Sequence, residues 1–137
     1  MNSILSLANR DSFPEGKALI IGGSGGIGES VCENFAANQV PVIFTYHNNL
    51  EAAQKLREKI NSYGVSAEYE QLSLTDRDKV ENFFSSLDQS EEKIHSIVNA
   101  TGADIRMRWI NELTYDEWQE VMHNDADGFF NLLMNQN

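Results

Sequence analysis

The sequence predicts an α/β domain built on a doubly wound parallel sheet. Short apolar runs of strand length alternate along the chain with segments whose apolar residues recur at helical spacing. The connections between these segments are short. Strands that alternate with helices form parallel sheets with right-handed crossovers, and helices cover both faces. We expect residues 1–16 to be an N-terminal extension and residues 17–137 to form the domain.

Four segments are predicted to be strands. Residues 17–21 form a nearly continuous apolar run that ends in glycines, which is typical of a strand buried on both faces. Residues 42–46 are rich in side chains that favour strands. The third strand, 67–72, alternates and carries charged residues, and the fourth, 94–98, follows a charged turn.

Four helices are predicted between and after these strands. The first follows the glycines and carries Ile27 on its apolar stripe, and the second ends at Gly64. The third is capped by residues 75–76, and the long last helix begins near Thr114, which forms a capping box with Glu117. The other apolar stripe residues are Val31, Phe35, Leu50, Ala53, Leu56, Ile60, Val80, Phe83, Phe84, Leu87, Trp118, Val121, Met122, Phe129, Leu132 and Leu133.

Composition excludes several classes of protein. The 137 residues suit one domain, and 10 basic against 21 acidic residues give a net charge of −11. This charge argues against a nucleic-acid or anionic-membrane partner, because phosphate binding needs an excess of Lys and Arg. The single cysteine, Cys32, excludes an internal disulfide. Without a targeting segment or an apolar run near the ~20 residues of a membrane span, we expect a cytoplasmic protein.

A glycine-rich loop joins the first predicted strand to the first predicted helix. It runs Gly-Gly-Ser-Gly-Gly-Ile-Gly over residues 22–28. Glycines let a backbone turn sharply and approach a pyrophosphate closely, and the following helix start offers unpaired N–H groups. In this strand-loop-helix setting the loop predicts dinucleotide binding, although a structural tight turn is the alternative. The predicted phosphate-binding residues are Gly22, Ser24, Gly26, Ile27 and Gly28.

Three motifs together resemble the short-chain dehydrogenase/reductase family, near its ketoacyl-carrier-protein reductase type. The family pattern Thr-Gly-x-x-x-Gly-x-Gly matches residues 21–28, with Ile21 in place of the threonine. The family's Asn-Asn-Ala-Gly is similar to the Asn-Ala-Thr-Gly of residues 99–102, and residues 118–131 are similar to its long helix. The resemblance implies a Rossmann-like fold whose strands, numbered along the chain, lie in the order 3-2-1-4. It also implies an NAD(P)(H)-dependent oxidoreductase with a carbonyl or alcohol substrate, and further cofactor contacts at Asn99, Ala100 and Gly102.

The residues after the second strand bear on the choice of dinucleotide. A carboxylate there would bind the ribose hydroxyls and exclude a 2′-phosphate. This chain instead has His47 and Asn48, and its first carboxylate, Glu51, lies in the next helix. Gly25 stands where NADP-preferring relatives often carry arginine. The sequence therefore favours NADP(H) over NAD(H). His47 is either a hydrogen-bond donor to the cofactor or a solvated loop residue. By resemblance, Leu74, after the third strand, is expected to contact the adenine.

The catalytic groups that the resemblance implies are not found in this sequence. No tyrosine is followed four residues later by lysine. By resemblance, the catalytic serine belongs to a fifth strand and the tyrosine and lysine to the next helix, so we expect a sheet truncated before that strand. Asp125 stands at the position of the family's relay asparagine, four residues from Val121 and from Phe129 on the apolar stripe. A relay role and a structural polar contact both remain open for it.

Three functions and two kinds of partner follow as hypotheses. The chain is either the cofactor-binding part of an oxidoreductase, a non-catalytic dinucleotide-binding module or pseudoenzyme subunit, or a methyltransferase-like domain. We expect a homo-oligomer, or a partner that covers the fourth strand and the last helix. Metal spacing is absent among the histidines, and Arg106 and Arg108 are expected to pair with surface carboxylates rather than to face a substrate.

Overall fold

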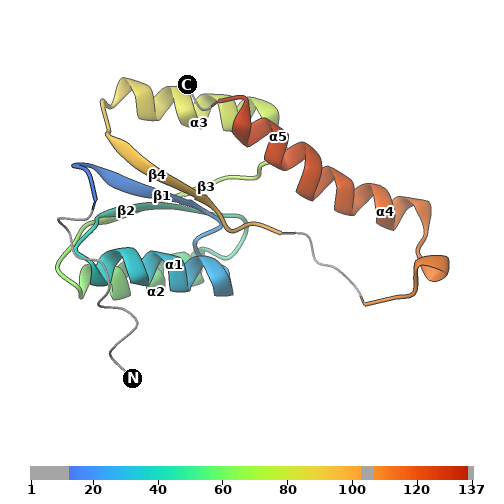
Figure 1. Ribbon diagram of the computed structural model, residues 1–137, viewed down its shortest axis with the longest axis horizontal. Helices are drawn as coiled ribbons and strands as arrows, with labels where there is room; N and C mark the ends of the chain where they lie inside the picture. The colour runs from blue at the N-terminus through green and yellow to red at the C-terminus, as the bar shows by residue number, and fades with distance from the viewer. Residues whose placement is uncertain (1–12, 103–106, 136–137) are drawn as a thin grey trace. The chain divides into compact units, whose positions relative to one another are not determined.

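A computed structural model describes residues 13–102 and 107–135 (Figure 1). Its sheet has four parallel strands in the order β3-β2-β1-β4, which confirms the predicted order. The structure is thus the expected Rossmann-like arrangement of a parallel sheet with helices. The strands are β1 (Lys17–Ile21), β2 (Val42–Tyr46), β3 (Ala67–Gln71) and β4 (Ile94–Asn99).

The described residues divide into two compact units. The first takes in the sheet with helices α1 and α2, and the second takes in residues 72–89 and the chain from 101 onward. In the first unit, α1 and α2 contact each other and lie along one face of the sheet (Figure 1). The helices are α1 (Gly26–Ala37), α2 (Leu50–Asn61), α3 (Arg77–Gln89), α4 (Tyr115–Met122) and α5 (Gly128–Leu133), with a short 3-10 helix η2 (Ile110–Glu112) and a π-helical turn η3 (His123–Asp127).

The core of the first unit is built on the two central strands. Residues 18–21 of β1 and 42–45 of β2 are buried, because β1 lies between β2 and β4 and β2 lies between β1 and β3. The pairing of β1 with β2 aligns Ala18 with Val42 and Ile20 with Phe44. This register places the carboxyl ends of β1 and β2 at the same edge of the sheet, where ligands bind in such folds.

Local contacts mark the ends of α2 and α3, and α2 ends three residues before the Gly64 that was predicted to end it. The Asn49 side chain accepts a hydrogen bond from the Ala52 N–H at 3.0 Å and begins α2. Gly64 follows the end of α2 with φ +86°, a left-handed conformation that glycine adopts easily. The Asp76 carboxylate accepts from the Lys79 N–H at 3.2 Å at the start of α3. These contacts satisfy backbone N–H groups that a helix start leaves unpaired.

The second unit carries the predicted capping box and a correction. Thr114 and Glu117 form the capping box at the start of α4, as expected. The last helix is not uniformly α-helical, because a π-helical turn separates α4 from α5. A π turn bonds residue i to i+5 and so shifts the phase of the side chains that follow. Asp125 lies in this turn and is exposed, so its predicted place on an inward apolar stripe is wrong.

A second correction concerns Ile27 in the first turn of α1. The apolar pattern predicts that it contributes to the core, but its side chain is 76% exposed. The next residue, Gly28, is the one that packs inward, and successive helical residues point about 100° apart. Among the described residues no helix is long and apolar enough to cross a membrane.

Candidate cofactor-binding site

The glycine loop begins with a turn that is held from the neighbouring strand. Gly22 has φ +79°, which takes the backbone out of the strand conformation at the end of β1. Its N–H donates to the Thr45 Oγ1 at 3.0 Å, and the Gly23 N–H donates to the Thr45 backbone oxygen at 2.9 Å. The first two residues of the loop are therefore both bonded to one residue of β2.

Two glycines of the loop lie where no side chain fits. A Cβ atom on Gly28 would lie 2.1 Å from the Gly22 carbonyl oxygen. A Cβ atom on Gly23 would lie 2.5 Å from the Phe44 Cβ and 3.1 Å from the Cys32 Sγ. The loop and the first turn of α1 thus pack on each other backbone to backbone. This is the close packing of helix, loop and strand that a dinucleotide-binding loop requires.

The start of α1 is open to an anion. Gly25 precedes the helix and supplies no side-chain cap, while its own N–H donates to the Gly22 carbonyl oxygen at 3.2 Å. The carboxylate of Glu29, in the first turn, pairs with the Lys59 ammonium at 3.1 Å. A helix start of this kind presents backbone N–H groups and the positive end of the helix dipole. Its backbone geometry fits a diphosphate, because glycine leaves the space before it unfilled.

The turn after β2 carries no carboxylate. His47 and Asn48 are both exposed there. The Gln71 side-chain amide, at the end of β3, donates to the His47 backbone oxygen at 2.7 Å and fixes the path of the turn. The predicted pair of polar residues therefore stands at the same edge of the sheet as the glycine loop.

The end of β4 reaches the same edge. Asn99 is the last residue of β4, and the Ala100 N–H donates to the Ile21 carbonyl oxygen at 2.8 Å. The predicted residues that follow the ends of β1, β2 and β4 are thus brought together within the first unit. Gly102 is exposed and belongs to the second unit.

Two further predicted residues, Leu74 and Asp125, also belong to the second unit. Leu74 is buried, and its carbonyl oxygen accepts a hydrogen bond from the Asn131 side-chain amide at 2.8 Å. A Cβ atom on Gly128 would lie 3.2 Å from the Leu74 Cβ, so α5 approaches this segment closely. Leu74 therefore has a structural role in its own unit beside the adenine contact predicted for it.

Three residues around the loop were not predicted from the sequence. Thr45 bonds Gly22, Gln71 holds the backbone of His47, and Gly23 avoids a clash with Phe44. One signal for Thr45 was present, since it is a polar residue that directly follows the apolar run at the start of β2. Gln71 carries no comparable signal, because its contact spans two strands.

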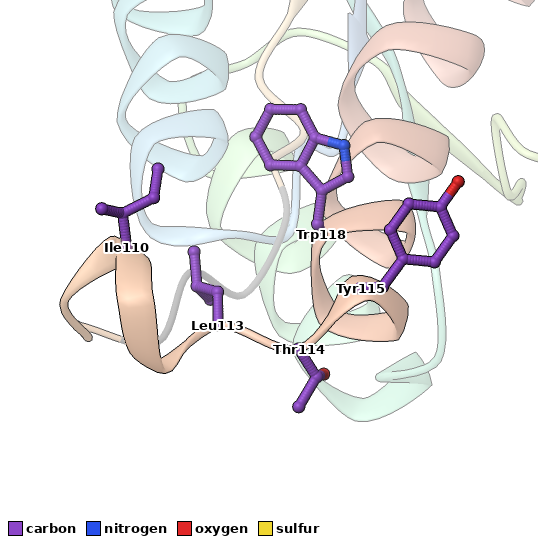
Figure 2. A pocket seen from close by; sticks show the side chains of 5 residues that line it. All are labelled: Ile110, Leu113, Thr114, Tyr115 and Trp118. Atoms are coloured by element: carbon purple, nitrogen blue, oxygen red, sulfur yellow. The ribbon is translucent and has the colours of Figure 1, made fainter.

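An apolar hollow lies at the start of α4 in the second unit. It has a volume of about 420 Å³ and is lined by Ile110, Leu113, Thr114, Tyr115 and Trp118. Figure 2 shows the Ile110 and Leu113 side chains on the same side as the Trp118 indole, and the Thr114 side chain pointing the other way. The Thr114 hydroxyl is committed to the capping box. The lining is therefore mostly apolar, and its other hydroxyl, that of Tyr115, accepts a hydrogen bond from the Gln119 side chain at 3.3 Å.

Two arginines follow β4 in the sequence and are candidates to face a substrate. Arg108 pairs with Glu117 at 3.1 Å, which confirms the expected surface pairing, whereas Arg106 lies outside the described residues. Within residues 13–102 and 107–135, no cluster of three or more His, Cys, Asp or Glu side chains is placed to bind a metal ion.

Comparison with known proteins gives consistent matches. The sequence pattern of the short chain dehydrogenase family matches residues 16–135. The uncharacterised oxidoreductase YgfF of Escherichia coli is 30% identical over 113 residues, which are 82% of this chain and 46% of YgfF. The 3-oxoacyl-[acyl-carrier-protein] reductase FabG of Staphylococcus aureus is 27% identical over 116 residues, which are 85% of this chain and 47% of FabG.

A solved structure agrees with these sequence matches. The short chain dehydrogenase of Burkholderia cenocepacia in complex with NADP superposes with a TM-score of 0.76 at 25% identity, covering 88% of this chain and 49% of that protein. This chain therefore spans about half the length of the curated relatives and the structure that it matches. The match over residues 16–135 covers most of the sequence, and the chain belongs to the short-chain dehydrogenase family.

Proposed function

We propose that this chain is the cofactor-binding part of an NAD(P)(H)-dependent oxidoreductase that interconverts a carbonyl and an alcohol. The observation that carries the proposal is the glycine loop, with its turn at Gly22, the contact of Gly28 and the uncapped start of α1. Such a cradle suits a diphosphate. The residues proposed to hold the cofactor are Gly22, Ser24, Gly26, Ile27, Gly28, His47, Asn48, Leu74, Asn99, Ala100 and Gly102.

NADP(H) is the proposed cofactor rather than NAD(H). The turn after β2 has His47 and Asn48 where an NAD-selective site would have a carboxylate, so no negative charge there opposes a 2′-phosphate. The Burkholderia relative, which binds NADP, supports the same choice. His47 is the proposed donor toward the phosphate.

The proposed reaction needs a hydride carrier, which this chain would bind, and a proton donor of a kind that this sequence does not contain. When bound, the cofactor supplies or accepts a hydride. The substrate oxygen also needs a proton donor with a pKa near neutral, and this sequence has no tyrosine followed four residues later by lysine. Asp125 is proposed as the proton-relay position, supported by its exposure in a π-helical turn, a feature frequent at functional sites.

Calorimetric titration of the chain with NADPH, NADH and S-adenosylmethionine tests the proposal. We expect NADPH to bind more tightly than NADH, and S-adenosylmethionine to give no heat of binding. Failure of both dinucleotides to bind would contradict the proposed function. Binding of S-adenosylmethionine alone would instead favour a methyltransferase-like domain.

A second candidate function is a non-catalytic dinucleotide-binding module. The absence of the Tyr-x-x-x-Lys pattern from this sequence favours it for the chain taken alone. NADPH oxidation measured with a panel of ketones distinguishes the two functions. Binding without turnover supports the module, and turnover by the isolated chain supports a complete catalytic site built in another way.

We also propose that the chain self-associates, or binds a partner, through β4 and its last helical segments. Two observations support this proposal. Within the described residues β4 pairs with β1 and ends the sheet order, and Phe129, Phe130 and Leu133 of α5 are exposed. A strand at the end of the sheet order and exposed apolar side chains favour association. A stable monomer in sedimentation at high protein concentration would contradict it.

A further inference from the structure

We infer that Thr45 is a positioning residue of the cofactor site, because its hydroxyl fixes the turn at the first glycine of the loop. The inference rests on the proposed function. It deepens that function by naming a residue outside the predicted contact set that determines the shape of the diphosphate cradle.

Thr45 holds two successive N–H groups of the loop with two different oxygen atoms. The aligned pairs of β1 and β2 end with Ile20 opposite Phe44. Beyond them, the Thr45 backbone oxygen accepts from the Gly23 N–H at 2.9 Å, and Thr45 Oγ1 accepts from the Gly22 N–H at 3.0 Å. The Thr45 side chain is 1% exposed, so the hydroxyl is part of the packed interior.

The Thr45 hydroxyl fixes Gly22 by a hydrogen bond, whereas Gly23 is fixed by packing. Gly23 is confined by Phe44 and Cys32, since even a Cβ atom there would lie 2.5 Å from Phe44 Cβ. Gly22 is held differently. Its φ of +79° takes the following backbone out of the strand conformation, and the Thr45 backbone oxygen accepts from the Gly23 N–H while the Gly22 N–H bonds the Thr45 hydroxyl. A partly buried N–H without an acceptor is unfavourable, and the Thr45 hydroxyl is the acceptor that the structure provides.

The position of Gly22 in turn determines the position of the helix start. The Gly22 carbonyl oxygen accepts from the Gly25 N–H at 3.2 Å, and a Cβ on Gly28 would lie 2.1 Å from the same oxygen. Loss of the hydroxyl therefore loosens the contact between the loop and the first turn of α1. The N–H groups proposed to bind the diphosphate would then lose their preorganised arrangement, which weakens binding.

The test compares three variants by calorimetric titration with NADPH. Thr45→Val keeps the shape of the side chain and removes the acceptor, so we expect the dissociation constant to rise on the order of tenfold. Thr45→Ser keeps the hydroxyl and should stay within about twofold of the parent. Val42→Ala, in the same buried strand, is the matched control that lowers the melting temperature without touching Gly22.

Amide hydrogen exchange at Gly22 provides a measurement that does not depend on the cofactor. In Thr45→Val the Gly22 amide should exchange faster than in the parent, while Thr45→Ser and Val42→Ala should leave its rate relative to neighbouring amides unchanged. If Thr45→Val does not fold, Thr45→Ala replaces it in both measurements.

The outcomes separate this inference from the proposed function. If the parent chain binds neither NADPH nor NADH, the proposed function fails and Thr45 has no cofactor site to position. If the parent binds NADPH and Thr45→Val binds equally well, the inference alone is overturned. An equal loss of affinity in Val42→Ala, or an unchanged Gly22 exchange rate in Thr45→Val, also overturns it.

Discussion

The glycine loop of the first unit and the helical run α4–η3–α5 of the second unit contrast in how their conformations are fixed. In the loop, backbone atoms approach so closely that an added Cβ on Gly28 would lie 2.1 Å from a carbonyl oxygen. In the helical run, large apolar side chains such as Trp118, Phe130 and Leu133 are exposed. The loop is therefore specified by contacts within its own unit. The run has an apolar surface that suits a further binding partner.

The contrast predicts that one methyl group added to the loop lowers the stability more than most side-chain substitutions in the helical run. Gly28→Ala should lower the free energy of unfolding by about 3 kcal/mol and the melting temperature by roughly 10 °C, because backbone atoms must move to admit the Cβ. Urea unfolding and thermal melting measure both quantities.

Gly26→Ala is the matched control for this substitution. A Cβ on Gly26 meets nothing within 4 Å, and the residue is the first of α1. We therefore expect it to be neutral or to stabilise the chain by about 0.5 kcal/mol, since alanine restricts the unfolded chain more than glycine does. Equal losses in the two variants would show that general flexibility, rather than the close contact at Gly28, governs the loop.

Adjacent leucines of α5 divide the helical run into a buried part and an exposed part. Leu132 is 1% exposed and Leu133 is 52% exposed. Leu132→Ala should lower the free energy of unfolding by about 2–3 kcal/mol, whereas Leu133→Ala should change it by less than about 0.5 kcal/mol. Leu133→Ala should instead weaken self-association, measured by sedimentation. Similar effects of both variants on unfolding would remove the distinction between the two sides of α5.

Sequence patterns predicted the elements whose causes are local. The capping box of Thr114 and Glu117 depends on two side chains three residues apart. The alternation of strands and helices predicted the parallel sheet, and the resemblance to the family predicted the order of its strands. The position of the glycine loop was predictable for the same reason, since the loop lies between a buried strand and a helix.

The features that escaped prediction depend on contacts between distant residues or on small shifts of helical phase. Thr45 and Gly22 are 23 positions apart, and their hydrogen bond follows from the register of β1 with β2. The π-helical turn around Asp125 interrupts a sequence whose apolar spacing suits a continuous α-helix. Ile27 is exposed because Gly28, the next residue of α1, faces the loop and the sheet instead. The apolar spacing alone does not reveal this phase of the helix.

Cys32, which packs beside the loop at Gly23, makes the stability of the first unit depend on pH. Burial raises the pKa of its thiol to about 12, whereas a thiol in the unfolded chain ionises near about 8.5. The unfolded chain thus loses the proton first, so the stabilisation is complete below about pH 8.5 and is lost as pH rises toward 12. At about pH 10 the loss is about 2 kcal/mol.

Urea unfolding at about pH 7 and about pH 10 measures this loss, with Cys32→Ala as the control. The alanine variant has no thiol to ionise, so its stability should fall less between the two pH values than that of the parent. An equal fall in both proteins would assign the pH dependence to other groups, Lys17 among them. Burial lowers the pKa of Lys17, but the hydrogen bonds to Glu92 and Glu68 and the attraction of their charges together raise it above its usual value.

Substitution of Gly25, at the exposed tip of the loop, has the smallest expected effect, a change in cofactor affinity. Gly25 has φ −79°, which any residue adopts, and a Cβ there would lie 3.5 Å from the Gly22 oxygen, an ordinary contact. Gly25→Arg should therefore leave stability unchanged and strengthen NADPH binding by about fivefold through a charge-assisted contact with the 2′-phosphate. NADH affinity should change little, and the gain should shrink at high salt. Gly25→Gln has similar length without charge, so an equal gain with Gln, or with NADH, would mean that Gly25 does not adjoin the 2′-phosphate. The tip of the loop would then play no part in the choice of cofactor.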